Sequence, residues 1–370
     1  MRTMKADIQQ SRFGTAVSRW AGVGPYYAMF PVGFATAAVK EHTKPGDCVF
    51  DPFAGRGTSL FAAASEGRVG LGIEINPVGW VYGKAKLQTA KSEDVEKQIR
   101  WLGTKAKNYR ATAKKLPLFF DHCFCSKAKE FLLAARDLLD WRRRKTDWTT
   151  MALLMIDLHG KRESAFSNQM RQTKAMSPQY AIQWWEEREL KPPEREPVEF
   201  MLKKVKWRYA KGHLDSGAGR IYLGDCQTKL NQWENKPPKL RAKLLLTSPP
   251  YCGVTNYFYD QWLRLWLLGG PDQPRNISDP CKGKFQNKQH YSNMLCNVFT
   301  KSESLLARNA VVYVRTDARQ FTKEATIEAL ETAFPRKKLR SQNHSLPSFT
   351  QTTLFDSEFE TKGEVDFVMW

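Results

Sequence analysis

Residues 45–75 read PGDCVFDPFAGRGTSLFAAASEGRVGLGIEI, and this stretch decides the fold class. A short apolar run, Cys48 to Phe50, follows a Pro-Gly-Asp turn, and a second run extends from Val69 to Ile75. A glycine loop and an Ala-rich segment separate the two runs. Two strands joined by a loop and a helix within about 30 residues predict a parallel pair with a right-handed crossover.

Four later apolar segments extend this pattern. They are bounded by turn residues and have the length of buried strands, and a helical segment over 322–332 lies among them. The strand segments are 220–225, 243–247, 310–314 and 364–370. Together with the first pair they predict an α/β protein with a doubly wound sheet.

The interval between Pro77 and Gly219 does not continue the alternation of strand and helix. It is strongly basic and its patterning is mostly helical. We therefore expect the sheet core to begin in residues 1–76, a helical insertion to occupy 77–219, and the remainder of the core to follow in 220–370.

The chain carries a large positive charge. Its 370 residues include 58 Lys and Arg against 38 Asp and Glu, a formal net charge of +20 with a pI near 9.6. A charge of this size favours a polyanionic partner such as nucleic acid. A hydrophobic fraction of 42% excludes intrinsic disorder, and no apolar run is long enough to span a membrane. We expect a cytoplasmic protein without a membrane partner.

The seven cysteines are scattered, with no repeated CxxC spacing. This pattern is typical of reduced thiols and predicts neither disulfides nor a metal site.

Basic clusters in the insertion are interleaved with aromatic residues. Each cluster taken alone is typical of a solvated helix face, whereas several in one insertion favour a surface that contacts phosphates. The tract 161–180, rich in short polar side chains, is either a base-reading or substrate-positioning loop or an ordinary surface loop. The clusters are Lys105/Lys107/Arg110/Lys114/Lys115, Arg142 to Lys145, and Lys203 to Arg208.

The glycine loop lies where an open parallel sheet binds its ligands, at the carboxyl end of a strand. Gly55 and Gly57 let backbone N–H groups approach a ligand, and Glu74, at the end of the next strand, can accept hydrogen bonds from ribose hydroxyls. The third glycine of the NAD fingerprint is absent, and Asp51 suits a cationic group better than a pyrophosphate.

A second polar turn, Thr247-Ser248-Pro249-Pro250-Tyr251, follows another predicted strand. Consecutive prolines cannot extend a central strand, so they predict a rigid, extended turn. In such a turn the Ser248 hydroxyl and the Pro249 carbonyl form a pair of acceptors for an amino group, and the Tyr251 ring can stack on a base.

The sequences DPFAGRGT (51–58), GIEINP (72–77) and TSPPY (247–251) resemble the cofactor and catalytic motifs of amino-methylating DNA methyltransferases. The resemblance covers about half of the chain and implies a Rossmann-like methyltransferase sheet that binds S-adenosylmethionine. It implies catalytic roles for Ser248, Pro249, Pro250 and Tyr251. The cofactor-binding residues that it implies are Tyr27, Pro31, Asp51, Pro52, Phe53, Gly55, Gly57, Thr58, Glu74, Asn76 and Asp225.

Within that resemblance, residues near Asp51 and the glycines surround the methionine end of the cofactor, Glu74 holds the ribose, and Asp225 lies near the adenine. The segment 27–31 resembles the short motif that precedes the glycine loop in permuted members. The Ser-Pro-Pro-Tyr form is typical of enzymes that methylate cytosine N4. The expected substrate is a flipped base in double-stranded DNA, and a cognate restriction endonuclease is a possible partner.

Direct transfer is the mechanism that the residues favour. Methylation at carbon 5 of cytosine requires a cysteine nucleophile in a Pro-Cys loop, and Pro280-Cys281 does not follow a strand at the catalytic position. With direct transfer, no strong base or metal is needed, because the proton leaves after the nitrogen has become cationic.

Three other functions remain open from the sequence. Adenine N6 is the nearest alternative target, and an RNA guanine-N2 methyltransferase is a second. A non-enzymatic DNA-binding module is the third, and it would use the charge but neither motif. Asn256, Tyr257 and Asp260 are candidates for contacting the base, and Arg315 and Arg319 for contacting substrate or phosphate.

Overall fold

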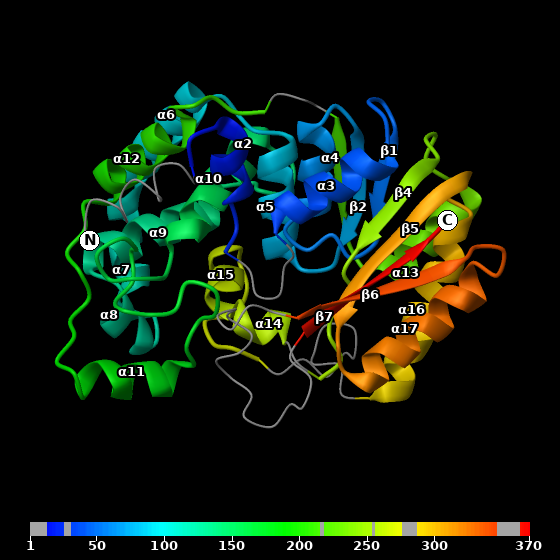
Figure 1. Cartoon of the computed structure of the whole chain (residues 1–370). Helices are drawn as coiled ribbons and strands as arrows, with labels where there is room; N and C mark the ends of the chain where they lie inside the picture. The colour runs from blue at the N-terminus through cyan, green and yellow to red at the C-terminus, as the bar shows by residue number, and fades with distance from the viewer. Residues whose placement is uncertain (1–12, 26–30, 215–217, 254–255, 276–286, 346–362) are drawn as a thin grey trace, which may run out of the picture. The chain divides into compact units, whose positions relative to one another are not determined.

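A seven-stranded sheet is the centre of the fold in the computed structural model of the chain, which describes residues 13–25, 31–214, 218–253, 256–275, 287–345 and 363–370. The strand order is β3-β2-β1-β4-β5-β7-β6. The first five strands of this order are parallel, and β7 is antiparallel to both of its neighbours (Figure 1). The strands are β1 (Cys48–Asp51), β2 (Val69–Glu74), β3 (Gly219–Leu223), β4 (Ala242–Thr247), β5 (Leu306–Asp317), β6 (Leu339–Ser345) and β7 (Gly363–Met369).

Helices cover both faces of this sheet because its strands are apolar on both sides. Val49 packs with Leu244 and Leu246 in a cluster below helices α3 and α4, whereas Phe50 belongs to the core on the other face. Successive residues of a strand point to opposite faces, so β1 contributes to both cores. The doubly wound, Rossmann-like sheet expected from the sequence is thereby confirmed (Figure 1). The helices are α3 (Val32–His42), α4 (Thr58–Ser65), α13 (Cys226–Asn235), α16 (Lys288–Glu303) and α17 (Gln320–Ala333).

The close packing of α4 on β2 depends on glycine. A Cβ at Gly70 would lie 2.8 Å from the Cα and the carbonyl oxygen of Leu60. We expect Gly70→Ala to lower the free energy of unfolding by about 1–3 kcal/mol because the backbone of α4 must move. Gly33→Ala is the matched control, since nothing lies within 4 Å of its Cβ position in α3. Chemical denaturation of both variants tests this, and equal midpoints would contradict it.

A second unit of the chain is helical and includes the basic interval between β2 and β3. We call residues 1–27, 77–215 and 258–276 the helical unit, and residues 28–76, 216–257 and 277–370 the sheet unit. The helices outside the sheet unit are α2 (Ala16–Ala21), α5 (Pro77–Leu87), α6 (Ser92–Ala106), η1 (Lys107–Tyr109), α7 (Arg110–Ala113), α8 (Phe119–Cys123), α9 (Ser126–Leu138), α10 (Lys145–Asp157), α11 (Pro178–Glu186), α12 (Pro197–Tyr209) and α15 (Trp262–Leu267), together with α14 (Tyr257–Asp260), which begins at the unit boundary.

This division assigns 258–276 to the helical unit, although the sequence ranges put that segment with the second part of the core. Side chains of α15 are responsible. Trp262 Nε1 donates to the Met176 carbonyl at 3.0 Å, and buried Arg264 donates from Nε to the Met155 carbonyl at 2.9 Å. Arg136 in turn donates to the Trp266 carbonyl at 2.7 Å. Hydropathy along the sequence does not reveal such side-chain to backbone contacts.

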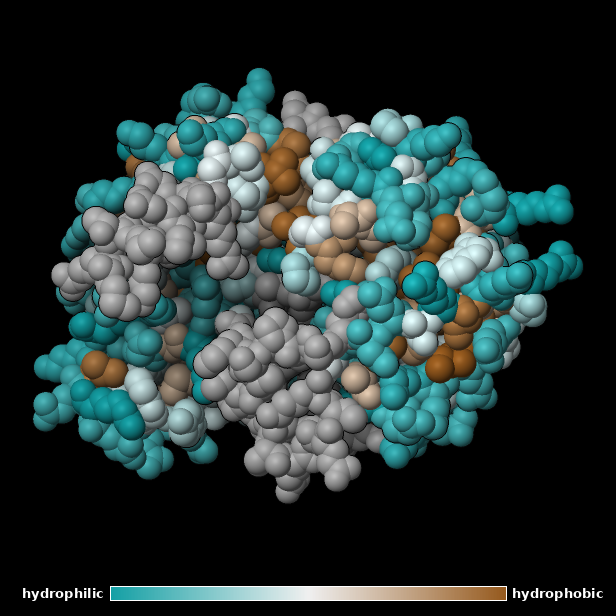
Figure 2. Space-filling model, viewed as in Figure 1, coloured by the Kyte–Doolittle hydropathy of each residue, from teal (hydrophilic) through white to brown (hydrophobic). Residues whose placement is uncertain are grey.

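The face shown in Figure 2 is largely hydrophilic, with scattered apolar side chains. Within the described residues, no helix combines the length and apolar character required to cross a membrane.

Candidate active site

The polar residues expected at the site follow adjacent parallel strands of the sheet unit. The glycine loop follows β1, Glu74 ends β2, and Ser248 follows β4, which pairs directly with β1. Strand order reverses between β1 and β4, and ligands of doubly wound sheets bind outside the carboxyl ends of the strands at such a point. The topology thus brings both sequence motifs to one edge of the sheet.

The glycine loop has a backbone that only glycine adopts easily. Gly55 and Gly57 have φ angles of 53° and 72°, in the left-handed region, and Gly57 caps the start of α4. A Cβ built on Gly55 would meet no atom within 4 Å, so open space adjoins the loop there. This space and the first turn of α4 suit a polar ligand that approaches the backbone.

Glu74 connects the end of β2 to the glycine loop. Its Oε2 accepts from the Gly55 amide and its Oε1 from the Asn76 amide, both at 2.7 Å. Burial raises the pKa of Glu74 to about 7, although both amide hydrogen bonds act in the opposite direction. Each carboxylate oxygen has two lone pairs, so the pair can still accept two hydroxyl donors, such as those of a ribose.

Asp51 connects the glycine loop to the Ser-Pro-Pro-Tyr turn, residues 248–251, which we call the catalytic turn for its expected role. Its Oδ1 accepts from the Phe53 amide at 3.0 Å and from the Thr247 hydroxyl at 2.5 Å, and Oδ2 accepts from the Ser59 hydroxyl. Asp51 is 2% exposed, and burial raises its pKa to about 6. With three protein donors, Asp51 holds β1, α4 and the end of β4 together.

The other expected cofactor residues occupy several places around this edge. Asp225 caps α13 by accepting from the Thr228 amide at 2.8 Å, and the preceding Gly224 amide donates to the Glu74 carbonyl. Pro31 is the exposed N-cap of α3, and Tyr27 lies outside the described residues. Pro52, Thr58 and Asn76 are buried beside the loop, whereas Phe53 is partly buried.

The expected catalytic turn presents a hydroxyl without an intramolecular partner among the described residues. The Ser248 side chain is partly buried and makes no hydrogen bond within them, whereas the adjacent Thr247 is fixed by Asp51. Pro249 and Tyr251 are buried. The turn therefore holds one free hydroxyl next to an anchored residue.

Beside this turn lies a network that sequence reasoning did not assign. The Tyr251 hydroxyl donates to Glu364 Oε1 at 3.3 Å. Arg315 forms a two-pronged ion pair with Asp366, and Arg319 forms one with Asp317. These contacts agree with a structural role for both arginines. The only sequence signal was the alternation of acidic and apolar residues in 364–367.

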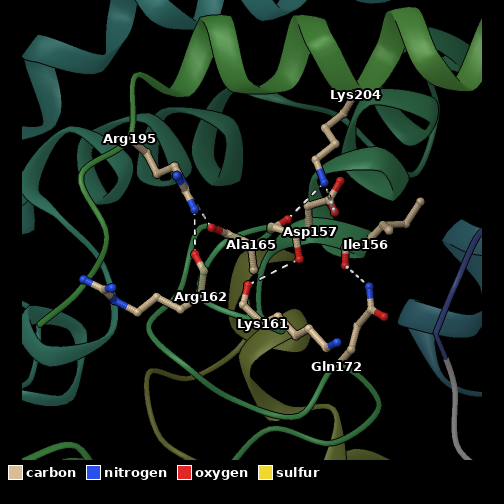
Figure 3. Close-up of polar contacts among 9 residues, drawn as sticks. Ile156, Asp157, Lys161, Arg162, Ala165, Gln172, Arg195 and Lys204 are labelled. Atoms are coloured by element: carbon tan, nitrogen blue, oxygen red, sulfur yellow. Dashed lines mark hydrogen bonds and ion pairs between the residues drawn. The ribbon is translucent and has the colours of Figure 1, made fainter. Parts of the chain in front are cut away.

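In the helical unit, the tract 161–180 begins in a loop held by side chains that reach its backbone. Arg195 donates to the carbonyls of Arg162 and Ala165, and Lys204 pairs with Asp157 at the start of the loop (Figure 3). Gln172 donates to the Ile156 carbonyl. These side-chain contacts therefore hold the backbone of the loop in place.

The three candidates for base contacts have different outcomes. Asp260, 6% exposed, pairs with Lys174 at 2.7 Å, and its carbonyl accepts from the Ala175 amide. The Tyr257 side chain is outside the described part of the chain, and Asn256 is partly buried.

Comparison with known proteins gives partial matches. Residues 6–78 match the model of a DNA methylase family, the N6 and N4 methyltransferases. Type II methyltransferase M.MjaII of Methanocaldococcus jannaschii is 30% identical over 88 residues, 24% of this chain and 17% of that protein. Type II methyltransferase M.Cfr9I of Citrobacter freundii is 43% identical over 54 residues, 15% of this chain and 18% of that protein. The chain thus covers less than a fifth of either relative.

Solved structures give a broader but more distant likeness. A putative S-adenosylmethionine-dependent methyltransferase from Streptococcus mutans has a TM-score of 0.39 at 9% identity, covering 93% of this chain and 50% of that one. The rRNA methyltransferase AviRa from Streptomyces viridochromogenes has a TM-score of 0.35 at 10% identity, and the match covers 97% of this chain and 91% of AviRa.

The family match includes the residues that form the glycine loop. The family match spans β1, the loop and Glu74, which are the parts of the site that lie before the helical insertion. In residues 6–78, the chain is similar to the N6 and N4 DNA methylases.

Proposed function

We propose that this chain transfers a methyl group from S-adenosylmethionine to the exocyclic N4 of cytosine in DNA. The observation that carries the proposal is the pairing of β1 with β4, because it brings the glycine loop and the Ser-Pro-Pro-Tyr turn to one edge of the sheet. The match of residues 6–78 to a DNA methylase family of N6 and N4 methyltransferases supports methyl transfer to an amino group of DNA, and the Ser-Pro-Pro-Tyr form of the turn favours cytosine N4.

S-adenosylmethionine fits the residues of this edge. Glu74 would accept hydrogen bonds from the two ribose hydroxyls on its remaining lone pairs, and the methionine end would lie against the loop around Gly55. Asp225 would lie toward the adenine. When bound, the cofactor supplies an electrophilic methyl group on its sulfonium.

The Ser-Pro-Pro-Tyr turn would hold the target base. The Ser248 hydroxyl and the Pro249 carbonyl would accept hydrogen bonds from the two N–H groups of the amino group, which would direct the nitrogen lone pair toward the methyl group. Tyr251 would stack on the flipped base. In well-oriented reactants, positioning can lower a barrier by about 7–11 kcal/mol, and these residues would contribute to the reaction through positioning.

The test is incubation of the purified protein with labelled S-adenosylmethionine and unmethylated genomic DNA, with total RNA in parallel. We expect label in N4-methylcytosine after nucleoside digestion and mass spectrometry. Label in N6-methyladenine would preserve the reaction and change the base, whereas label in RNA alone would favour the guanine-N2 alternative. Binding of DNA without cofactor binding or methyl transfer would favour the non-enzymatic module.

We further propose that the helical unit contacts DNA phosphates through its unpaired basic residues. Arg143 and Lys145 are exposed, and no described carboxylate lies within ion-pair distance of either. By contrast, Lys203 pairs with Glu199 at 2.8 Å and Arg188 with Glu187 at 3.1 Å. An existing carboxylate partner reduces the attraction of a lysine or arginine for phosphate.

This difference predicts unequal effects on salt-dependent DNA binding. The slope of log K against log salt concentration is negative, and its magnitude should fall by about 1–2 in the double variant Arg143→Gln/Lys145→Gln. Each lost phosphate contact removes about 0.9 from that magnitude. The control, Arg188→Gln/Lys203→Gln, removes the same two residue types and should change the slope little. Fluorescence anisotropy at several salt concentrations measures both slopes. Equal changes in the two variants would contradict the assignment.

A further inference from the structure

We propose that Glu364 is a positioning residue that fixes the Tyr251 ring for stacking on the target base. The inference rests on the proposed function, because it assigns a partner to the ring of the catalytic turn. The contact joins the turn after β4 to the start of β7, 113 residues away in sequence.

Glu364 has one carboxylate oxygen directed at the tyrosine. Tyr251 Oη donates to Oε1 at 3.3 Å, and the Tyr251 side chain is buried, with the residue 7% exposed. A hydrogen bond at the far end of the ring restricts both side-chain torsions of the tyrosine. A ring that is already fixed loses less conformational freedom when a base stacks on it.

The second oxygen of Glu364 is held by Arg315. Arg315 Nη1 lies 3.4 Å from Glu364 Oε2, and the same guanidinium binds Asp366 through Nε at 2.6 Å and Nη2 at 2.7 Å. The guanidinium carbon of Arg315, Cζ, also lies 3.5 Å from the centroid of the Phe34 ring. The two hydrogen bonds to Asp366 and the contact with the Phe34 ring restrict rotation of the Arg315 guanidinium. The guanidinium therefore orients the carboxylate of Glu364.

Sheet pairing fixes the geometry of this network. Arg315 and Asp366 are register partners in the antiparallel pair of β5 and β7, and Asp317 is the partner of Glu364. Residues 364 and 366 lie on the same face of β7 because side chains alternate along a strand. The network therefore extends from a rigid sheet to the catalytic turn.

The experiment is a double-mutant cycle on single-turnover methyl transfer to DNA. Tyr251→Phe and Glu364→Ala should each lower the rate about tenfold, the loss expected for a hydrogen bond to a charged group. The double variant should be no slower than either single variant, since one interaction is lost in all three. The Kd for S-adenosylmethionine and the KM for DNA should remain near wild type.

Two further variants separate positioning from stability. Glu364→Gln keeps an acceptor for the tyrosine and should retain a rate within about threefold of wild type, even if Glu364→Ala folds poorly. Glu328→Ala, the same truncation at an exposed position of α17, should leave the rate unchanged.

The outcomes are distinguishable. Additive losses in the cycle, or a wild-type rate for Tyr251→Phe, would overturn the role of Glu364 while leaving the proposed function intact. A wild-type protein that binds S-adenosylmethionine but methylates no DNA would overturn both.

Discussion

Ser248→Ala is expected to lower the single-turnover rate of methyl transfer by about 100-fold or more, with little change in the Kd for S-adenosylmethionine. The Ser248 hydroxyl makes no hydrogen bond within the described residues, so its removal should cost little stability. Loss of one preorganised polar contact to a reacting group typically costs about 10²–10³ in rate. Rapid-quench assays with labelled cofactor measure the rate, and calorimetry measures the Kd.

Ser304→Ala provides the comparison for this substitution. Ser304 is exposed at the end of α16, so the same loss of a hydroxyl should leave both quantities unchanged. A normal rate for Ser248→Ala would remove Ser248 from the catalytic assignment. A weakened Kd with a normal rate would instead make it a cofactor residue.

Glu74→Gln is expected to weaken S-adenosylmethionine binding most strongly at high pH and to remove most of its pH dependence. In the free protein, burial raises the pKa of Glu74 to about 7. Ribose hydroxyls donate to the ionised carboxylate, so the wild-type Kd should rise as pH falls below 7, by up to about tenfold per pH unit. Calorimetric titrations from pH 5.5 to 8.5 measure this profile.

The stability of the free protein should respond to pH in the opposite direction. Because the pKa of Glu74 is raised by folding, its contribution favours the folded state below pH 4.5 and is lost as pH rises through about 7. The full difference is on the order of 3 kcal/mol. Glu74→Gln should lack this loss, which denaturant titrations at pH 5 and pH 8 would detect. A wild-type Kd independent of pH would contradict the proposed role of Glu74.

The sheet core is predictable where its signals are local. Residues 45–75 contain two apolar runs, a glycine loop and a helix in one continuous stretch, and β1, α4 and β2 form there. Strand β6 was missed, because 339–345 is polar and four of its residues, 340–343, are exposed. It lies at the sheet edge, where pairing with β7 replaces hydrophobic burial as the main determinant.

The candidate site is predictable to the same extent. Glycines and a carboxylate at strand ends indicated the cofactor edge, and the Ser-Pro-Pro-Tyr turn indicated the second motif. The bond from Thr247 to Asp51 and that from Tyr251 to Glu364 join residues 196 and 113 positions apart. Such distant partners depend on strand order, which one sequence does not specify.

The placement of the helical unit within the chain affects how the sheet can form. Strand β2 must pair with β3, bringing Gly70 to Gly219, although the whole basic interval separates them. Closing so long a flexible loop is slow and entropically costly. Within the helical unit, however, the Tyr209 hydroxyl donates to the Ala90 carbonyl at 2.8 Å, which joins the beginning and the end of the interval. Early folding of these helices would shorten the effective loop and accelerate closure of the sheet, so refolding rates should fall when the helices are destabilised.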